Sequence, residues 1–350
     1  MKQTIYTLFL LLFLSKAILA QTEAHYVCPP CNSSCDTLKY YGPGTCQHCG
    51  MELLTMDTHQ EEITPQKIAF YLQDGVEVLD FAGPMEVFSY AGFEVFTVSK
   101  TREPIVSQGI LKIIPDYSLQ DAPPANLLAF FGGNGRASFA DPTIQDWIKK
   151  QTDIDYYFSV CTGAFALAET QLLDNLTATT FHNALDDLEQ DFPAVNVVRN
   201  ARYVDNGKVI TTAGISAGID GALHLVAKLK GFNTARRVAY HMEYDHWKPG
   251  GGLLLSDDNP YEPAMNIPHI DAYLGTYEFY DQQQIRIAIN PQDQSLYAIV
   301  EGMNYPLFYL ETDLFQDIGN EQVRFQRGAQ GQITGYTTTE KPDQFLRKLD

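Results

Sequence analysis

Basic side chains are scarce in this chain of 350 residues. There are 24 lysines and arginines against 43 aspartates and glutamates, which gives a formal net charge of −19. Such an acidic surface repels a phosphate backbone, so we expect no nucleic-acid partner. Hydrophobic residues still make up 45% of the chain, which is enough to bury substantial cores and excludes wholesale disorder.

Long apolar runs are also missing, apart from a short one at the start. Residues Met1–Ala20 run from Lys2 through the apolar block TLFLLLFL to small residues that end in Ala17 or Ala20, a pattern typical of a cleaved secretory signal. The block is shorter than the roughly 20 residues of a membrane-spanning helix. No later segment predicts a span, and neither alanine precedes a cysteine that could carry a lipid. We therefore expect a protein exported to the periplasm or the extracellular space.

Cysteine is rare outside one cluster. Five of the six cysteines lie between Cys28 and Cys49, and the sixth, Cys161, stands alone. The polar, proline-containing stretch 60–66 predicts a linker between the two regions. We expect four parts: a signal peptide (1–20), a Cys-rich domain (21–59), an α/β domain (66–248) and a small β-rich domain (262–350).

The cysteine cluster has the spacing of a metal site. Two Cys-x2-Cys pairs are separated by fourteen residues, and each pair can bring two sulfurs to one turn, as a tetrahedral zinc site requires. A disulfide framework is the alternative in an oxidising compartment, and it would leave one of five cysteines unpaired. The predicted ligands are Cys28, Cys31, Cys46 and Cys49, with Cys35 as a surplus thiol and His25 and His48 as auxiliary ligands.

The stretch PGTCQHCGMEL within this cluster resembles the small heavy-metal-binding domain found beside metal-transport proteins. That resemblance covers about thirty residues and implies zinc, or a softer ion such as copper, in the same four-cysteine site.

From Lys67 to Trp247, short apolar runs alternate with amphipathic stretches. This alternation predicts βα units around a buried parallel sheet. A Pro-Gly-rich break follows at 249–252, and after Asp271 the segments become strand-sized and are separated by turn signals, which predicts a small antiparallel β domain. The clearest segments are IAFYL, PMEVFSYA, FEVFTVS, NLLAFF, PTIQDWIKKQ and YYFSV, followed by the helix-like FALAETQLL, the strand-like TATTF, the hairpin-like RYVDNGKVITT and the helix-like GIDGALHLVAKL.

The segment YYFSVCTGAFALAE places Cys161 on a sharp turn from a strand into a helix. A nucleophile at such a turn projects above the sheet, and the partial positive charge of the helix start favours its thiolate. Gly163 allows the turn to pack tightly. The alternative is a cysteine that is simply buried in the core, where cysteines are common.

Two further segments predict groups at the same carboxyl edge of the sheet. The strand LLAFF ends in Gly132 and Gly133, whose N–H groups could face an oxyanion. In DGVEVLDFAGPMEVF, Asp80 lies on the loop after the first strand, where it is either a functional carboxylate or a turn and capping residue. A protonated Asp80 could donate to a thiolate and act as a general acid, whereas an ionised Asp80 would raise the thiol pKa.

Five segments together resemble the ThiJ/PfpI superfamily of class I glutamine amidotransferase-like domains: GVEVLDFAGPMEVF, FFGGNG, SVCTGAFALAE, LTATTFHNALDDL and VITTAGISAGIDGALHLV. They occur in the right order over residues 67–248, and the branch they resemble contains isonitrile hydratases and the ligand-like domains of AraC-type regulators. The resemblance implies a flavodoxin-like fold and a possible homodimer.

The same resemblance assigns roles to individual residues. It implies Cys161 as nucleophile, Asp80 as its acidic partner, and Gly133 with the Thr162 backbone as oxyanion donors. Thr162 stands where the peptidase-like branch has histidine, which argues against proteolysis. Many relatives have a histidine directly after Ala-Thr-Thr, whereas here Phe181 intervenes and His182 is displaced by one position.

The leading hypothesis is therefore an exported, cysteine-dependent enzyme that acts on a small-molecule electrophile and adds water across an isonitrile carbon. The alternatives are glyoxalase-like handling of reactive carbonyls and a non-enzymatic metal or redox stress sensor. A regulator role is disfavoured because a strand-rich segment follows the α/β domain where such proteins have a helix-turn-helix. The stretch AYLGTYEFY resembles the small β domains appended to exported serine hydrolases of the β-lactamase type, and we assign no site to it.

Overall fold

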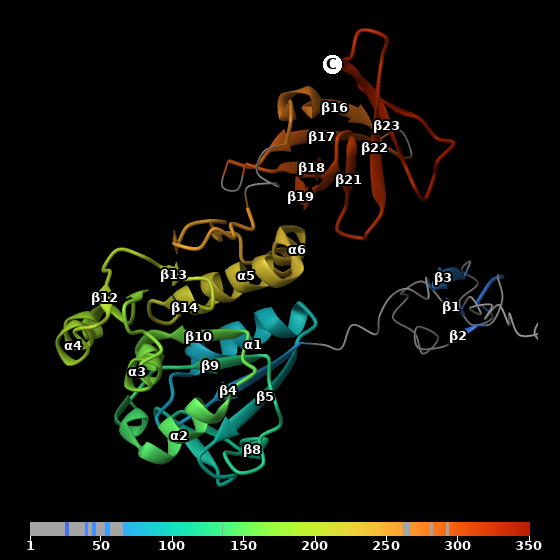
Figure 1. Cartoon of the computed structure of the whole chain (residues 1–350). Coiled ribbons are helices and arrows are strands. Elements are labelled where there is room, and N and C mark those ends of the chain that lie inside the picture. The colour runs from blue at the N-terminus through green and yellow to red at the C-terminus, as the bar shows by residue number, and fades with distance from the viewer. Residues whose placement is uncertain are drawn as a thin grey trace, which may run out of the picture. The chain divides into compact units, whose positions relative to one another are not determined.

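A computed structural model gives the fold of this chain (Figure 1). The structure describes residues 25–27, 39–40, 44–46, 53–56, 66–134, 136–261, 267–280, 283–291 and 294–350. The chain divides into two units, Met1–Thr64 and Pro65–Asp350.

The second unit is built around an eight-stranded sheet in the order β15-β13-β14-β10-β9-β4-β5-β8. All neighbouring strands are parallel except β13 and β14, which form the expected hairpin. The parallel sheet expected from the alternating segments is confirmed, and so is the flavodoxin-like fold that the family resemblance implied. Its strands are β4 (Lys67–Tyr71), β5 (Glu94–Ser99), β8 (Tyr117–Ser118), β9 (Leu127–Phe130), β10 (Tyr156–Val160), β13 (Tyr203–Asp205), β14 (Val209–Thr212) and β15 (Leu253–Leu254).

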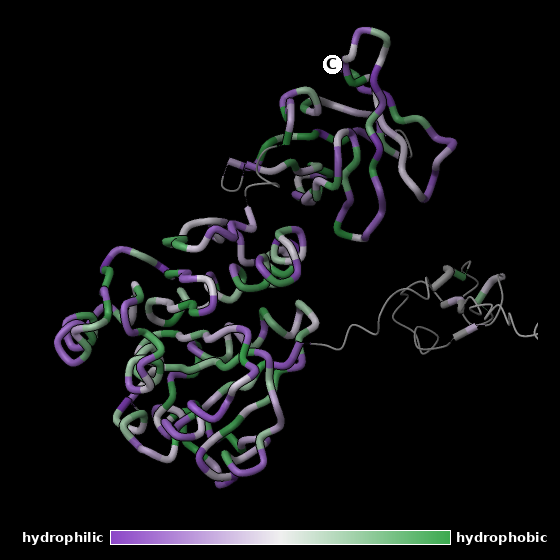
Figure 2. Tube along the Cα trace, viewed as in Figure 1, coloured by the Kyte–Doolittle hydropathy of each residue, from purple (hydrophilic) through white to green (hydrophobic). Residues whose placement is uncertain are grey.

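Helices cover both faces of this sheet. Alternate residues of a strand point to opposite faces, so Phe70 of β4 packs in the core with α1, α5 and α6, while the adjacent Tyr71 packs in the core with α2, α3 and α4. Both faces are thus apolar, and Figure 2 shows hydrophobic residues throughout this region. The helices are α1 (Val78–Tyr90), α2 (Pro142–Lys150), α3 (Ala164–Glu169), α4 (Leu185–Asp191), α5 (Ala217–Lys230) and α6 (Phe232–His241).

Two local expectations are wrong. The segment TATTF forms only the two-residue β11 (Thr177–Ala178), which pairs with β12 (Asn196–Val197) outside the main sheet. The helix after Cys161 ends at Glu169, because the Thr170 hydroxyl bonds back to the Ala166 carbonyl at 2.9 Å and the chain then turns. The remaining short elements are the hairpin β6 (Ile105–Ser107) and β7 (Leu111–Ile113), and the 3-10 helices at Arg136–Ala140, Cys161–Gly163, His182–Ala184 and Ile270–Tyr273.

The carboxyl-terminal region contains two antiparallel sheets, as expected. Their shared core contains Tyr273, Tyr277 and Phe315, all fully buried, so these aromatic rings are core residues and not a ligand surface. One sheet has β16 (Gly275–Glu278), β17 (Gln284–Ile289), β18 (Leu296–Val300) and β19 (Met303–Pro306); the other has β20 (Phe308–Glu311), β21 (Leu314–Gln316), β22 (Gln322–Arg327), β23 (Ile333–Thr338) and β24 (Leu346–Arg347).

In the first unit, β1 (His25–Val27) pairs with β2 (Lys39–Tyr40) and β3 (Leu54–Met56) in an antiparallel sheet. Cys46 is buried beside this sheet, with its sulfur 3.2 Å from the Tyr40 hydroxyl. The other predicted metal ligands, Cys28, Cys31 and Cys49, lie outside the described residues, as do Cys35, His48 and the signal segment. The metal site and the signal peptide therefore stay predictions.

Among the residues that the structure describes, no group of three or more histidine, cysteine, aspartate or glutamate side chains is arranged to hold a metal ion. None of the helices in the described ranges is long and apolar enough to cross a membrane.

Candidate active site

Cys161 directly follows β10 and adopts a left-handed backbone conformation with φ = 59°. This conformation is costly for a residue other than glycine and persists where surrounding contacts enforce it. Here the Cys161 N–H donates to the Ala213 carbonyl at 3.1 Å, and the Thr180 hydroxyl donates to the Cys161 carbonyl at 2.7 Å. The sharp turn predicted from the sequence is thus present and is held from both sides.

Two glycines let neighbouring strand ends close around this turn. A Cβ added to Gly163 would lie 2.2 Å from the Phe130 carbonyl oxygen, and one added to Gly132 would lie 2.6 Å from the Thr162 nitrogen. Only a residue without a side chain permits such approach. The ends of β9 and β10 therefore meet beside the cysteine.

Asp80 lies in the first turn of α1, and not on the preceding loop where the sequence pattern placed it. It does not cap the helix, since Glu77 occupies the N-cap position. The carboxylate is completely buried and accepts the Gly132 N–H at 2.9 Å and the Ile215 N–H at 3.1 Å. A hydrogen bond with the Cys161 thiol completes its partners, so the structure brings Asp80 and Cys161 into direct contact.

The protonation of this pair differs from the expectation for a helix start. Burial raises the pKa of Asp80 to about 6, although the hydrogen bonds from Gly132, Cys161 and Ile215 each lower it. Burial, followed by the charge of Asp80, raises the pKa of the Cys161 thiol to about 12. The expectation that the helix start favours the thiolate is therefore wrong, because burial and a neighbouring carboxylate outweigh a helix of six residues. At neutral pH the pair holds one proton.

The thiol opens into a small cavity of about 140 Å³. Polar groups line one part of it and two apolar side chains, Phe181 and Ile215, line another. The cavity therefore offers a nucleophile, hydrogen-bonding groups and an apolar wall in one place. The lining residues are Glu77, Gln108, Gly133, Asn134, Cys161, Thr162, Phe181 and Ile215.

Gly133 and Thr162, the predicted oxyanion donors, both line this cavity. Gly133 has φ = 116° and forms an antiparallel β-bridge with Val76. Two backbone hydrogen bonds hold this bridge: the Glu77 N–H donates to the Gly132 carbonyl, and the Asn134 N–H donates to the Gly75 carbonyl. The Thr162 N–H hydrogen-bonds the Cys161 sulfur and lowers its pKa. The Thr162 hydroxyl is buried and has no hydrogen-bond partner among the described residues.

The displaced histidine does not reach the site. His182 is exposed at the start of a 3-10 helix, and its ring lies against Phe181 with centroids 4.2 Å apart. Phe181 lines the cavity in its place, held close to Gly214, where an added Cβ would lie 2.5 Å from the phenylalanine ring. No histidine lines the cavity in the described part of the chain.

The sequence interpretation missed Glu77, Gln108, Asn134, Phe181 and Ile215. Glu77 lies three residues before Asp80, the spacing of neighbours on one helix face, so this carboxylate could have been found. Gln108 lies in the turn of the β6–β7 hairpin, far from any of the recognised segments, and only the fold brings it to the thiol.

The comparisons with known proteins match the α/β region of the chain. The DJ-1/PfpI family matches residues 66–228. The isonitrile hydratase of Pseudomonas putida is 35% identical over 181 residues, which cover 51% of this chain and 78% of that protein. The HTH-type transcriptional regulator CdhR of Pseudomonas aeruginosa is 26% identical and matches 50% of this chain, which spans only 54% of the regulator.

Among solved structures, a THiJ/PfpI family protein from Pseudomonas syringae is 30% identical, with a TM-score of 0.49 over 52% of this chain and 76% of that one. The identity to the Pseudomonas putida protein extends over most of that relative's length. The residues that the family matches include Asp80, Cys161 and the glycines around them. The chain therefore belongs to the DJ-1/PfpI family.

Proposed function

We propose that this protein is a cysteine-dependent enzyme that adds water across the carbon of a small isonitrile to give an N-substituted formamide. The observation that carries the proposal is the contact between the buried Asp80 carboxylate and the Cys161 thiol, and Cys161 lines a small, partly apolar cavity. The identity to an isonitrile hydratase supports it.

The protonation of the pair defines the first step. Because Cys161 keeps its proton at neutral pH while Asp80 is ionised, Asp80 is placed to take the thiol proton as the sulfur attacks. The sulfur forms a bond to the isonitrile carbon, and the proton that Asp80 received passes to that same carbon. The product of this step is a thioimidate on Cys161.

Water then completes the reaction. It adds to the thioimidate carbon, with its proton taken through Asp80 and the imidate nitrogen protonated, and the carbon–sulfur bond breaks to release the formamide and restore the thiol. We assign the backbone N–H groups of Gly133 and Thr162, which both line the cavity, to the negative charge that develops beside the sulfur.

Glu77 adds a second carboxylate to the cavity. It lines the same space, and its charge raises the pKa of both Asp80 and Cys161. No lysine or arginine lines the cavity among the described residues. We infer that the site accepts neutral or cationic electrophiles and repels anionic ones.

We further propose that the protein works outside the cytoplasm, supported by the signal-like Met1–Ala20.

The test is incubation of the full chain with cyclohexyl isonitrile and the smaller ethyl isonitrile, followed by chromatographic detection of the formamides. We expect turnover that is lost in Cys161→Ala and in Asp80→Asn, and kept in Asp146→Asn, which removes an exposed carboxylate on α2. Absence of formamide from either substrate, or turnover unchanged in Cys161→Ala, would overturn the proposal. Lactate formation from methylglyoxal in the same preparation would instead assign the pair to reactive carbonyls.

A further inference from the structure

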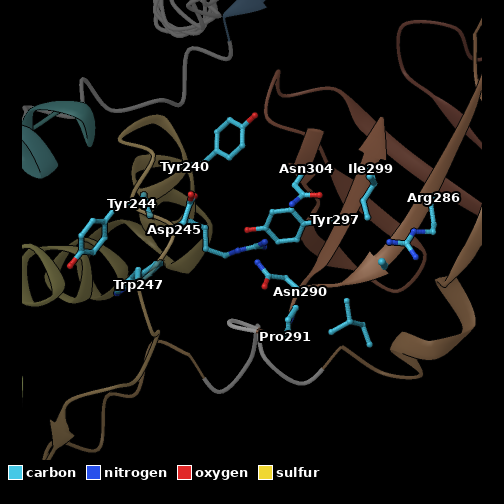
Figure 3. A pocket seen from close by; sticks show the side chains of 14 residues that line it. Tyr240, Tyr244, Asp245, Trp247, Arg286, Asn290, Pro291, Tyr297, Ile299 and Asn304 are labelled. Carbon is cyan, nitrogen blue, oxygen red and sulfur yellow. The ribbon is translucent and has the colours of Figure 1, made fainter. Parts of the chain in front are cut away.

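Two cavities in the described part of the chain differ in their chemistry. The larger has a volume of about 550 Å³ and lies between the end of α6 and strands β17 to β19 (Figure 3). Arg236 of α6 donates to the Leu307 carbonyl at 3.2 Å. The adjacent Arg237 donates to the Asp317 carbonyl at 3.0 Å, so the two walls of this cavity are fixed to each other.

The described residues that line the larger cavity include no cysteine, serine, threonine or histidine that could attack a substrate. The smaller cavity, of about 140 Å³, is lined by Cys161. The choice between substrates of a thiol-dependent reaction is therefore made in the smaller cavity.

This cavity admits little more than the reacting group. Cys161 is only 6% exposed, so a substrate has to enter the cavity before the sulfur can reach it. A water molecule occupies roughly 30 Å³ in the liquid, so 140 Å³ holds about five groups of that size. An isonitrile is linear at its nitrogen and reacts at its terminal carbon. The first carbon of its substituent therefore still lies within the cavity when the sulfur attacks.

Phe181 forms an apolar wall that is held in place. Its side chain packs against the hydrophobic clusters on both faces of the sheet, and its ring lies against the His182 ring with centroids 4.2 Å apart. Gly214 lies against the same ring, since a Cβ added to it would be 2.5 Å from the nearest ring atom. A side chain that is packed on several sides keeps one position, because protein interiors have few voids into which it could move.

Ile215 forms the second apolar wall and is fixed through its backbone. It has φ = 53°, a left-handed conformation that is strained for a β-branched residue. Its N–H donates to the buried Asp80 carboxylate at 3.1 Å, which holds the backbone in this conformation. The Ile215 side chain is 37% exposed and Phe181 is half-buried, so both walls reach from the cavity to the surface.

The polar part of the cavity has no room to recede either. Gly133 is bridged to Val76, and a Cβ added to Gly133 would lie 2.3 Å from the Gly75 carbonyl oxygen. Thr162 is buried and directly follows the constrained turn at Cys161. A wider substituent can therefore enter only if packed groups are displaced, and such overpacking is unfavourable.

We propose that Phe181 and Ile215 make the Cys161 cavity selective for isonitriles with an unbranched alkyl substituent. A primary alkyl chain passes between the walls toward the opening, whereas a tertiary substituent, with its methyl groups directly behind the nitrogen, collides with them. The inference rests on the proposed function and assigns a substrate class to it. An excess of one methylene group in an apolar pocket changes kcat/KM roughly tenfold or more, and we expect a preference of this size.

Two isomers separate shape from size and polarity, because butyl isonitrile and tert-butyl isonitrile have the same composition. We expect kcat/KM of the full chain to be at least about tenfold higher for the butyl isomer. Phe181→Ala will reduce this ratio to about threefold or less, and Phe345→Ala, which removes a partly exposed phenylalanine of the carboxyl-terminal region, will leave it unchanged. Ile215→Ala, which keeps the backbone N–H that Asp80 accepts, is the second variant if Phe181→Ala does not fold.

The same shapes can be tested without isonitrile turnover. Pentanenitrile and trimethylacetonitrile carry the same two substituents on a cyano group, which is as linear as the isonitrile group. Each nitrile is added before alkylation of Cys161 by iodoacetamide, and the rate is measured on the Cys161 peptide by mass spectrometry. We expect pentanenitrile to protect the thiol at about a tenfold lower concentration than trimethylacetonitrile, and Phe181→Ala to remove this difference.

The outcomes distinguish the selection from the activity. Equal kcat/KM for the two isonitriles, or equal protection by the two nitriles, would overturn the selection and leave the isonitrile activity in place. Absence of formamide from both isonitriles, together with stronger protection by pentanenitrile, would overturn the activity and leave the selection in place. A butyl preference that stays at about tenfold in both Phe181→Ala and Ile215→Ala would overturn the role of these two residues.

Discussion

Removing the charge of Asp80 will make the Cys161 thiol more acidic. The thiol pKa of about 12 lies three units above its ordinary value of 9.0. Three units correspond to about 4 kcal/mol of preference for the protonated form. Burial is the largest cause and the Asp80 charge is the second. Asp80→Asn removes only the second cause, so the pKa will fall without reaching its ordinary value.

The expected magnitude follows from the fraction of thiolate. At pH 8 a thiol with a pKa of about 12 is ionised to a fraction of about 10⁻⁴. A neighbouring like charge shifts a pKa by roughly one unit or more, so Asp80→Asn will react at least about tenfold faster with a neutral alkylating reagent at this pH. In the unsubstituted protein the rate will keep rising with pH through pH 9, where an ordinary thiol begins to level off.

The assay is alkylation by iodoacetamide between pH 7 and pH 9.5, with the rate measured on the Cys161 peptide by mass spectrometry. Reading the peptide separates Cys161 from the five cysteines of the amino-terminal cluster. Asp146→Asn is the control for the loss of one negative charge elsewhere. A rate that levels off below pH 9 in the unsubstituted protein, or an Asp80→Asn variant that reacts more slowly, would refute the reasoning about burial and charge.

Three further predictions follow from the same contacts. The pKa of Asp80 is raised from 3.8 to about 6, so the folded protein retains a proton there that the unfolded chain has lost; this contribution to stability is complete below about pH 4 and is lost as the pH rises through 6. The unsubstituted protein will therefore lose up to about 3 kcal/mol in its free energy of unfolding, measured in urea, between pH 4 and pH 7.5, relative to Asp80→Asn. A difference between the two proteins that is the same at both pH values would contradict the shift. Cys161 can be modified with two methanethiosulfonate reagents, one that carries a cationic trimethylammonium group and one that carries an anionic sulfonate. Glu77→Gln will lower the ratio of the cationic to the anionic rate by about threefold or more, whereas Glu86→Gln, exposed on the same helix, will leave this ratio unchanged. An unaltered ratio in Glu77→Gln would exclude charge selection by this carboxylate. Gly163→Ala will lower the melting temperature by several degrees, because its Cβ would lie 2.2 Å from the Phe130 carbonyl, while Gly319→Ala, where no atom outside its chain neighbours lies closer than 3.4 Å, will change it little.

The elements around Cys161 were predictable because their signals are local. A buried strand such as YYFSV, followed by small residues and an apolar helix, predicts a tight turn at the edge of a parallel sheet. The tight packing at Gly163 was also predictable, since close backbone approach requires glycine. The position of Asp80 at the same sheet edge followed from the rule that parallel strands present their carboxyl ends together.

The composition of the cavity was not predictable in the same way. Gln108, Phe181 and Ile215 come from three separate connections, and connections carry no periodic pattern that places their side chains. Whether Phe181 or His182 lines the cavity depends on where the chain leaves β11 and enters the 3-10 helix at His182–Ala184. The sequence indicated a strand over the whole of TATTF, which ends at Phe181.

The sequence by itself determined the succession of βα units along the chain, the turn that carries Cys161 and the place of Asp80 at the same edge of the sheet. These features depend on hydrophobic pattern and on small residues at fixed positions. Only the tertiary structure decided the protonation of the pair and the cavity between α6 and the carboxyl-terminal strands. A pKa depends on burial and on every charge nearby, and the docking of Arg236 and Arg237 onto distant carbonyl groups depends on contacts between residues about 70 to 80 positions apart. Neither the pKa values nor this docking can be predicted from any one segment of the chain.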